Sequence, residues 1–204
     1  MRQGGAPAIE HVGRFAMRQD PVHQTVVRIT RRLDELGIPY AIAGGMALAV
    51  HGYVRATVDV DILVTPEGLK LIHEHLEGLG YVPLFEKSRH LRDAETGVRV
   101  EFLTTGAFPG DGKPKPVAFP DPAQCAVEIE GARYLKLATL VELKLASGMS
   151  APHRARDIGD VVSLIEELRL GEEFAQQLHP HVRAKYLELW RAVEEDRRNP
   201  DHLG

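Results

Sequence analysis

AGGMALAVHGYVRATVDVDILV, residues 43–64, is the stretch that decides the fold of this sequence. From Val58 to Val64, β-branched residues alternate with Asp59, Asp61 and Leu63. Because the side chains of a strand alternate between its two faces, both carboxylates lie on one face of one strand. Burying two like charges there is costly unless a cation neutralises them, and Mg²⁺ prefers oxygen ligands. The aspartate pair therefore fits either a metal site or an edge strand with a solvated polar face.

A glycine pair precedes this strand. Residues 40–43 have the composition of a short buried strand, Gly44 and Gly45 follow directly, and residues 46–53 have helical composition. A strand that passes through glycines into a helix leaves backbone N–H groups free, with no Cβ to block a ligand. Such a turn is suited to holding phosphate. Combined with the aspartate strand, it favours a site for a metal and a phosphate-bearing ligand.

The composition excludes several classes of protein. The chain has 204 residues, of which 44% are hydrophobic, so it can bury a sizeable core. No apolar run approaches the roughly 18 residues of a membrane span, and the N-terminus lacks a signal-peptide core, so we expect a soluble, cytoplasmic protein with no membrane partner. Cys125 is the only cysteine, which excludes an internal disulfide. The net charge of −4 argues against broad coating of nucleic acid but is compatible with one local basic patch.

Local signals divide the chain into three parts. Residues 1–19 lack a clear period and are expected to form a flexible N-terminal arm. Residues 20–137 contain several strands and two amphipathic helices that begin at the cap-proline pairs Asp20-Pro21 and Thr65-Pro66. Residues 138–204 contain a short helical pattern ended by Gly148, a longer one around Ile158 to Leu168, and a final one from about Pro180 to Asp196. We therefore expect a larger lobe of mixed structure followed by a small helical lobe.

A third carboxylate lies on a later predicted strand. Residues 98–103 follow a hairpin turn at 94–97, and Glu101 shares a face with Arg99 and Leu103. Glu101 would complete a carboxylate triad if this strand lies beside Asp59 and Asp61. It would otherwise be an exposed strand residue, and the pattern alone leaves both interpretations open.

Taken together, these motifs resemble the nucleotidyltransferase superfamily that shares the polymerase-β-type fold. The resemblance rests on a glycine pair, a short helix, an aspartate pair and a later acid, carried by Gly44, Gly45, Arg55, Thr57, Asp59, Asp61 and Glu101. The segments LVELKLASG and RARDIGDVVSL further resemble the AbiEii-like nucleotidyltransferases, which include toxins of type IV toxin–antitoxin systems. The resemblance, over about residues 24–168, implies an α+β fold in which helices flank a mixed sheet and a helical C-terminal lobe follows a catalytic lobe.

The resemblance also implies which residues bind the nucleotide. Gly44 and Gly45 would hold the triphosphate of the nucleoside triphosphate donor, and Arg55 and Thr57 would belong to the same nucleotide-binding group. Lys144 would contact phosphate or nucleotide from the helical lobe.

The acids would supply the catalytic and metal-binding groups. Asp59, Asp61 and Glu101 would bind Mg²⁺ or Mn²⁺, and Asp160, or alternatively Asp157, would be the catalytic acid of the helical lobe. Glu101 stands where the family usually has aspartate, so its carboxylate extends about one methylene further from the backbone.

The implied activity is transfer of a nucleoside monophosphate to an acceptor, with release of pyrophosphate. The toxin resemblance implies an RNA acceptor and an antitoxin protein as partner. Two other functions fit the same residues: a nucleotide-binding regulatory module that has lost transfer activity, and a small-molecule nucleotidyltransferase of the antibiotic-modifying kind.

Overall fold

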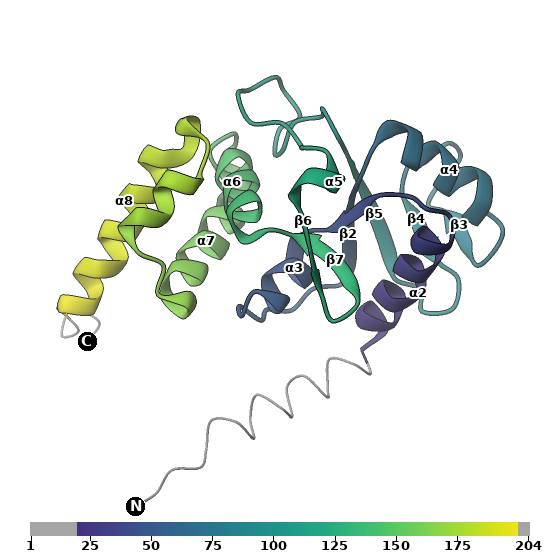
Figure 1. The fold of residues 1–204 in the computed structure, drawn as a ribbon, viewed down its shortest axis with the longest axis horizontal. Coiled ribbons are helices and arrows are strands. Elements are labelled where there is room, and N and C mark those ends of the chain that lie inside the picture. The colour runs from purple at the N-terminus through teal and green to yellow at the C-terminus, as the bar shows by residue number, and fades with distance from the viewer. Residues whose placement is uncertain (1–19, 200–204) are drawn as a thin grey trace, which may run out of the picture.

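A mixed seven-stranded sheet forms the centre of the protein (Figure 1). The computed structural model describes residues 20–199, so the predicted arm at residues 1–19 lies outside the described residues. The strand order is β3-β4-β5-β2-β1-β7-β6. The strands are β1 (Tyr40–Ile42), β2 (Asp59–Val64), β3 (Tyr81–Pro83), β4 (Leu91–Asp93), β5 (Arg99–Thr104), β6 (Ala126–Ile129) and β7 (Ala132–Leu135).

Helices flank the sheet and continue beyond it. They are α2 (Pro21–Glu35), α3 (Gly44–Val50), α4 (Pro66–Leu76), α5 (Pro122–Cys125), α6 (Leu137–Gly148), α7 (Ala155–Leu168) and α8 (Pro180–Arg198), with short 3-10 turns η1 (Pro152–Arg154) and η2 (Glu172–Gln177). This arrangement confirms the predicted class, a mixed sheet flanked by helices.

Both predicted cap-proline helix starts are confirmed. The Asp20 side chain accepts a hydrogen bond from the backbone N–H of Val22 at the start of α2. The Thr65 hydroxyl does the same for the N–H of Gly68 at the start of α4. Each side chain satisfies a donor that the first helical turn leaves unpaired, which is why these residue pairs mark helix starts so reliably.

The central strands confirm the predicted alternation. In β2, Val60, Ile62 and Val64 are fully buried, whereas Asp59 and Asp61 are only partly buried. One face of β2 therefore contributes to the core and the other carries the acids. Strand β1 runs antiparallel to β2, and β5 runs parallel to it on its other side. The acids consequently lie in the interior of the sheet rather than on an edge strand.

One boundary differs from expectation. The sequence places a glycine turn before a helix that begins near Met46, but α3 already begins at Gly44. Gly44 has φ +58°, so the chain turns sharply as it leaves β1 and enters the helix at the same residue.

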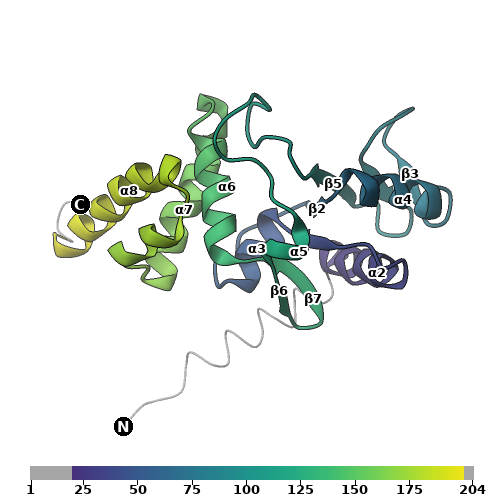
Figure 2. The same ribbon diagram turned by 45° about the horizontal axis from the view of Figure 1, so that its top comes forward.

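Three helices at the C-terminal end pack together beside the sheet (Figure 2). Helices α6, α7 and α8 contact one another, and Val161, Leu164, Val182 and Tyr186 are fully buried there. Trp190 is partly buried and packs against this core. Helix α6 follows β7 almost directly.

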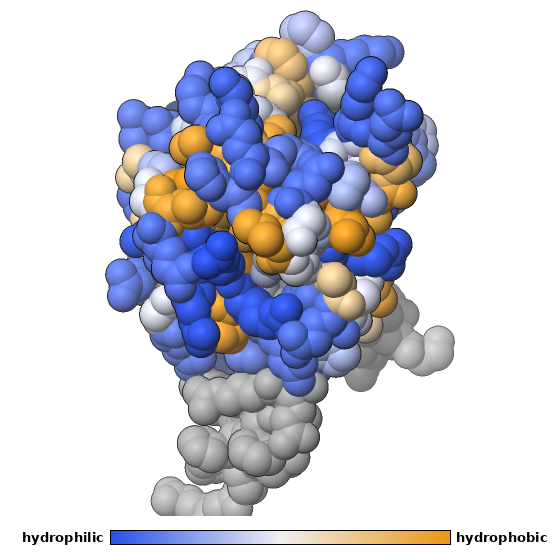
Figure 3. Space-filling model, turned by 90° about the vertical axis from the view of Figure 1, so that its right-hand side faces the viewer, coloured by the Kyte–Doolittle hydropathy of each residue, from blue (hydrophilic) through white to orange (hydrophobic). Residues whose placement is uncertain are grey.

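The face at the β3 end of the sheet is mostly hydrophilic, and hydrophilic areas separate its apolar ones (Figure 3). Exposed apolar side chains near this end are Leu71, Leu79, Val82 and Phe85. Within residues 20–199, no helix has the length and apolar character needed to cross a membrane.

Candidate active site

The acidic residues of β2 and β5 meet on one sheet face. In the parallel register, Asp61 lies opposite Glu101 and Asp59 lies opposite Arg99. Residues paired in this way project from the same side of the sheet, so the four side chains form a single charged strip. The expectation that the Glu101 strand neighbours the aspartate strand is thereby confirmed.

Asp61 lies in this strip beside two other carboxylates and has a raised pKa. Burial, followed by the negative charges of Asp59 and Glu101, raises the pKa of Asp61 to about 7, although the positive charges of Lys144 and Arg55 lower it. Burial is the largest cause because a carboxylate that loses water favours its neutral form. Ionisation of Asp61 is therefore opposed by burial and by two like charges, and a bound cation or a proton would remove that cost.

Arg99 modifies the role expected of Glu101. The Arg99 guanidinium lies 2.7 Å from Glu101 Oε1, and both side chains are only partly exposed. Glu101 thus has a protein cation as its partner. Among residues 20–199, no group of three or more His, Cys, Asp or Glu side chains is arranged to hold a metal ion. The chemistry of Asp59 and Asp61 fits a divalent cation, while Glu101 would first have to leave Arg99.

The two glycines allow the acids to come close to the backbone of α3. A Cβ at Gly44 would collide with the carboxylate of Asp61, and a Cβ at Gly45 would lie 2.7 Å from Cβ of Thr57. The space left by the missing side chains is therefore filled from within the protein. This gives the glycine pair a structural reason that the sequence interpretation, based on phosphate access, did not include.

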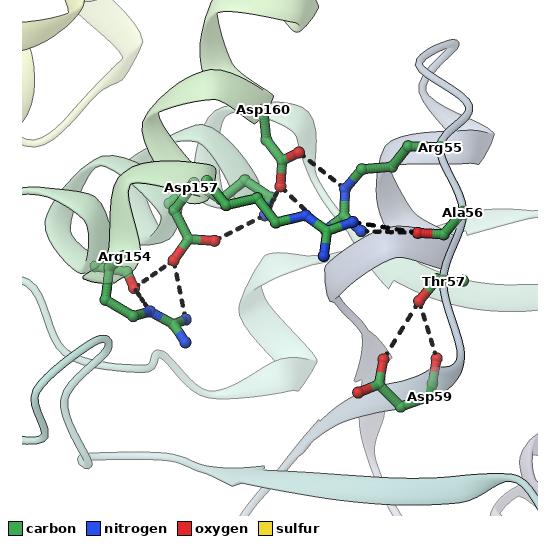
Figure 4. Close-up of polar contacts among 10 residues, drawn as sticks. Arg55, Ala56, Thr57, Asp59, Arg154, Asp157 and Asp160 are labelled. Atoms are coloured by element: carbon green, nitrogen blue, oxygen red, sulfur yellow. Dashed lines mark hydrogen bonds and ion pairs between the residues drawn. The ribbon is translucent and has the colours of Figure 1, made fainter. Parts of the chain in front are cut away.

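Thr57 orients the first aspartate. Its hydroxyl lies 3.3 Å from both the backbone oxygen and Oδ1 of Asp59 (Figure 4). Thr57 also packs against Gly45. A single side chain thus connects the N-terminus of α3 to the start of the acidic strand.

A buried ion-pair network lies on the opposite side of the site (Figure 4). Arg55 binds Asp160 through two bonds, Nε to Oδ1 at 2.8 Å and Nη2 to Oδ2 at 3.1 Å. Lys144 donates to the same Oδ2 at 2.6 Å. Both oxygens of Asp160 are therefore occupied, and Asp160 is only 2% exposed. This geometry makes Asp160 a holder of two cations rather than a free base.

The network continues along α7. Lys144 also donates to Oδ1 of Asp157 at 3.2 Å, and Asp157 Oδ2 accepts hydrogen bonds from Ser147 at 2.6 Å and pairs with Arg154 at 2.9 Å. The pKa of Asp157 is lowered overall: burial opposes the shift, but Lys144, Ser147 and Arg154 outweigh it. Asp157 thus stays ionised at neutral pH.

Ala56 links this network to the loop before β2. Its carbonyl oxygen accepts hydrogen bonds from Arg55 at 3.2 Å and from Arg156 at 3.4 Å. The guanidinium groups of Arg154 and Arg156 are on exposed residues of η1 and α7. The loop that carries Arg55 and Thr57 is therefore held between α3 and α7.

The structure sorts the predicted site residues into two clusters. The acidic strip contains Asp59, Asp61 and Glu101, with Gly44, Gly45 and Thr57 against it. The ion-pair network contains Arg55, Lys144, Asp157 and Asp160, and two of its cations influence the pKa of Asp61. The sequence interpretation missed Arg99 and Ser147 as members. Only Arg99 carried a detectable signal, because it shares the strand face of Glu101.

The comparison with protein families decides the identity of the chain. The sequence matches, over residues 10–143, a family described as uncharacterised nucleotidyltransferase. This range is more than half of the 204 residues. The chain belongs to this nucleotidyltransferase family. No curated protein matches the sequence significantly.

Solved structures similar to this nucleotidyltransferase agree with its fold. The complex of ANT(2″)-Ia with adenylyl-2″-tobramycin is 16% identical with a TM-score of 0.52, over 84% of this chain and 96% of that one. The solution structure of the antibiotic-resistance factor ANT(2″)-Ia is 16% identical with a TM-score of 0.53, over 88% of this chain and 99% of that one. An antigenic nucleotidyltransferase-like protein from Paracoccidioides brasiliensis is 18% identical with a TM-score of 0.48, over 90% of each chain. At these identities, the first two matches support the nucleotidyltransferase fold alone.

Proposed function

We propose that this nucleotidyltransferase transfers a nucleoside monophosphate from a nucleoside triphosphate to an acceptor hydroxyl in a Mg²⁺- or Mn²⁺-dependent reaction. In this reaction the acceptor hydroxyl loses its proton to solvent and its oxygen forms a bond to the α-phosphorus. The bond from the α-phosphorus to the oxygen that bridges to the β-phosphate breaks, and pyrophosphate leaves with the electron pair of that bond. The observation that carries the proposal is the incompletely neutralised strip of Asp59, Asp61 and Glu101, in which the pKa of Asp61 is raised to about 7.

Asp59 and Asp61 are the residues that would hold the cation. Their side chains share one face, Thr57 orients Asp59, and the backbone of Gly44 lies directly against the Asp61 carboxylate. A divalent cation bound there would neutralise triphosphate charge and favour the in-line displacement. Glu101 lies beside Asp61 and would face the acceptor or a second cation once separated from Arg99.

The protein cations would complete the electrostatic environment. The positive charges of Lys144 and Arg55 both lower the pKa of Asp61, which supports a role for these two residues beside the acidic strip. We assign Lys144 to the phosphates, and Arg55 to nucleotide binding and to the connection with Asp160. Together with the backbone at Gly44 and Gly45, these groups would position the triphosphate, and positioning with charge stabilisation supplies most of the rate in phosphoryl transfer.

For the acceptor, we favour RNA. The acids near the site are already paired: Asp157 and Asp160 with Lys144, and Glu101 with Arg99. They therefore offer little to a polycationic small molecule, whereas Arg154 and Arg156 lie on exposed residues beside the loop at Ala56. Guanidinium groups suit phosphate recognition. The AbiEii-like resemblance supports the same choice, together with a toxin role and an antitoxin partner.

Acceptor labelling tests this proposal. Each of the four α-³²P-labelled nucleoside triphosphates is incubated with Mg²⁺, the protein and either total RNA or an aminoglycoside. We expect the label to transfer to RNA, and to be lost in Asp61→Asn and Asp59→Asn. Asp196→Asn makes the same chemical change at an exposed position on α8 and should transfer normally. Transfer that survives in the Asp59→Asn, Asp61→Asn double variant would refute the proposal, and labelling of the aminoglycoside alone would overturn the choice of RNA.

The Arg99–Glu101 ion pair favours one competing function, a nucleotide-binding module without transfer activity. In that case the pair at 2.7 Å would be a permanent replacement for a second cation. Calorimetry would then show Mg²⁺-dependent nucleotide binding while no acceptor becomes labelled. Restoration of transfer by Arg99→Ala would identify the ion pair as the cause.

A further inference from the structure

Ser147, Asp157 and Arg154 form a compact cluster where α6 ends and α7 begins. The Ser147 hydroxyl donates to Asp157 Oδ2 at 2.6 Å and accepts from Arg154 Nε at 3.0 Å. Arg154 also pairs with the same carboxylate oxygen at 2.9 Å. Ser147 is 3% exposed, so its hydrogen bonds are shielded from water. One oxygen of Asp157 is thereby held, and the other remains directed at Lys144.

We propose that Asp157 and Ser147 are positioning residues that aim the Lys144 ammonium at the donor triphosphate. This inference rests on the proposed transfer function, and it assigns to Asp157 and Ser147 an indirect role through Lys144. An ammonium has three N–H donors. Asp160 and Asp157 accept from Lys144 in two directions, so the remaining donor direction is set by both carboxylates together. Asp160 shares its two oxygens between Arg55 and Lys144, whereas Asp157 directs Oδ1 at Lys144 while Ser147 and Arg154 hold its Oδ2.

The charges of the network show that Asp157 cannot act by attracting the triphosphate. Arg55, Lys144 and Arg154 carry three positive charges, and Asp157 and Asp160 carry two negative ones, so the network has a net charge of about +1. Removing the charge of Asp157 would make the network more positive and strengthen its attraction for a triphosphate. Asp157 therefore acts against binding by charge alone. Its contribution must come from where it holds the ammonium.

The glycine-containing loop after β5 fixes the same serine from the other side. The Ser147 carbonyl oxygen accepts from the Ser150 hydroxyl at 2.6 Å, and Ser150 accepts from the N–H of Asp111 at 3.1 Å. A Cβ at Gly110 would lie 2.8 Å from the Ser147 carbonyl oxygen, so the loop backbone packs directly on this residue. The end of α6 is held from both sides, which gives the Ser147 hydroxyl a defined direction.

Steady-state kinetics and nucleotide binding test the inference with Asp157→Asn and Ser147→Ala. We expect kcat to fall about 10- to 100-fold in Asp157→Asn, because a misplaced group can cost that much. The dissociation constant for a non-hydrolysable nucleotide with Mg²⁺ should stay equal or decrease. Ser147→Ala keeps every charge and should lower kcat by about 5-fold, the value of one hydrogen bond. Glu167→Gln removes one exposed charge from the same helix and should change neither quantity.

Two outcomes would overturn the inference. The first is an unchanged kcat in Asp157→Asn, which would leave Lys144 independent of its second partner. The second is a loss of nucleotide binding in parallel with a loss of melting temperature in both variants, which would indicate a purely structural cluster. Ser147→Ala keeps the test valid if Asp157→Asn fails to fold, because it leaves the ion pairs intact.

NMR of ¹⁵N-lysine-labelled protein provides a readout that does not depend on transfer. Lys144 is 7% exposed and held by two carboxylates, so we expect its ammonium signal to be visible and assigned by its absence in Lys144→Arg. Asp157→Asn should shift and broaden this signal, and Glu167→Gln should not. An unchanged signal would overturn the inference even if transfer is confirmed. If the wild-type protein labels no acceptor, the proposed function fails, while the NMR result still decides whether Asp157 positions Lys144.

Discussion

The two charged regions of the site differ in how their carboxylates are paired. In the ion-pair network of α6 and α7 each carboxylate is bonded to cations, whereas in the acidic strip of β2 and β5 carboxylates lie beside one another. In the network, Asp160 has both oxygens bonded to Arg55 and Lys144, and Asp157 is bonded on both sides. In the strip, Asp61 faces Asp59 and Glu101, and its pKa rises to about 7. Asp160 is more deeply buried than Asp61, so the degree of burial alone does not account for the contrast.

This difference in pairing indicates which of the two regions would bind a cation. Paired and hydrogen-bonded charges can be buried without further help, whereas like charges that share a face need a cation or a proton. The network can therefore hold its arrangement without a ligand, and it fixes the positions of Arg55 and Lys144. The strip is the part of the site that a cation would complete. Four changes would break or sharpen this comparison.

The largest effect is expected from opening the network at its most buried member. Asp160→Asn would leave Arg55 and Lys144 without the charge that they share, and breaking a buried pair on one side costs about 3–5 kcal/mol. Urea unfolding followed by circular dichroism measures this loss of the free energy of unfolding. Asp196→Asn at the surface should stay within about 0.5 kcal/mol of wild type. A loss below about 1 kcal/mol for Asp160→Asn would mean that the network contributes little to stability.

In the acidic strip, replacing an aspartate by asparagine is expected to raise the free energy of unfolding instead of lowering it. Asp61 has its folded pKa raised to about 7, so between about pH 4 and pH 7 the folded state binds more protons than the unfolded state. Asp61 therefore makes the free energy of unfolding fall as pH rises through this window. Asp61→Asn lacks this contribution and should exceed wild type above pH 7 by on the order of 2–4 kcal/mol.

Unfolding curves of wild type and Asp61→Asn, recorded from pH 4 to pH 8 without divalent cations, check this expectation. The two proteins should converge near pH 4, where Asp61 is protonated in the folded state. A constant difference across the whole range would contradict the assignment of the pKa shift to Asp61.

A glycine comparison tests how tightly the strip packs against α3. Gly44 has φ +58° and lies against the Asp61 carboxylate, so Gly44→Ala combines backbone strain with a collision and should cost about 2 kcal/mol or more. Gly159 in α7 has nothing within 4 Å of an added Cβ, so Gly159→Ala should stabilise the helix by about 0.5–1 kcal/mol. Thermal unfolding of both variants measures the contrast. Equal effects of the two substitutions would show that Asp61 can move away at little cost.

The smallest effect concerns the one cation on the strip. Arg99 is partly exposed, and ion pairs of this kind contribute less than about 1 kcal/mol, so Arg99→Ala should barely change stability. It should release Glu101 and tighten binding of Mg²⁺ by about 2- to 5-fold, the equivalent of that interaction. Titration calorimetry with MgCl₂ measures the affinity. Weaker binding in Arg99→Ala would indicate that Arg99 supports the cation site instead of competing with it.

Much of the framework followed from short-range patterns. The alternation around Asp59 and Asp61 predicted a strand with an acidic face, and the pairs Asp20-Pro21 and Thr65-Pro66 predicted helix starts. The glycine pair was expected between strand and helix, and it does lie where β1 passes into α3, although α3 already begins at Gly44. Its structural role was incomplete, because the side chains of Asp61 and Thr57 that fill the space arrive from another strand and loop.

The second half of the candidate site depended on contacts that no local pattern contains. Arg55 and Asp160 are 105 residues apart, and their bidentate pairing has no signal in either segment. The interpretation of RARDIGDVVSL left Asp157 and Asp160 as alternatives for one role, whereas the structure gives each a separate set of bonds. Likewise, the sequence indicated that Arg99 and Glu101 share a strand face, but their ion pair became evident only from the side-chain geometry.

By itself, the sequence determined the strand that carries the two aspartates, the helix starts and the class of fold, because these depend on side-chain period and on neighbours within a few residues. The tertiary structure decided that Glu101 lies in register with Asp61, that Asp61 fills the space beside Gly44, and that Arg55 and Lys144 share Asp160. These features depend on how distant segments dock. The charge left on Asp61 is the sum of all those contacts, so it exists only in the folded protein.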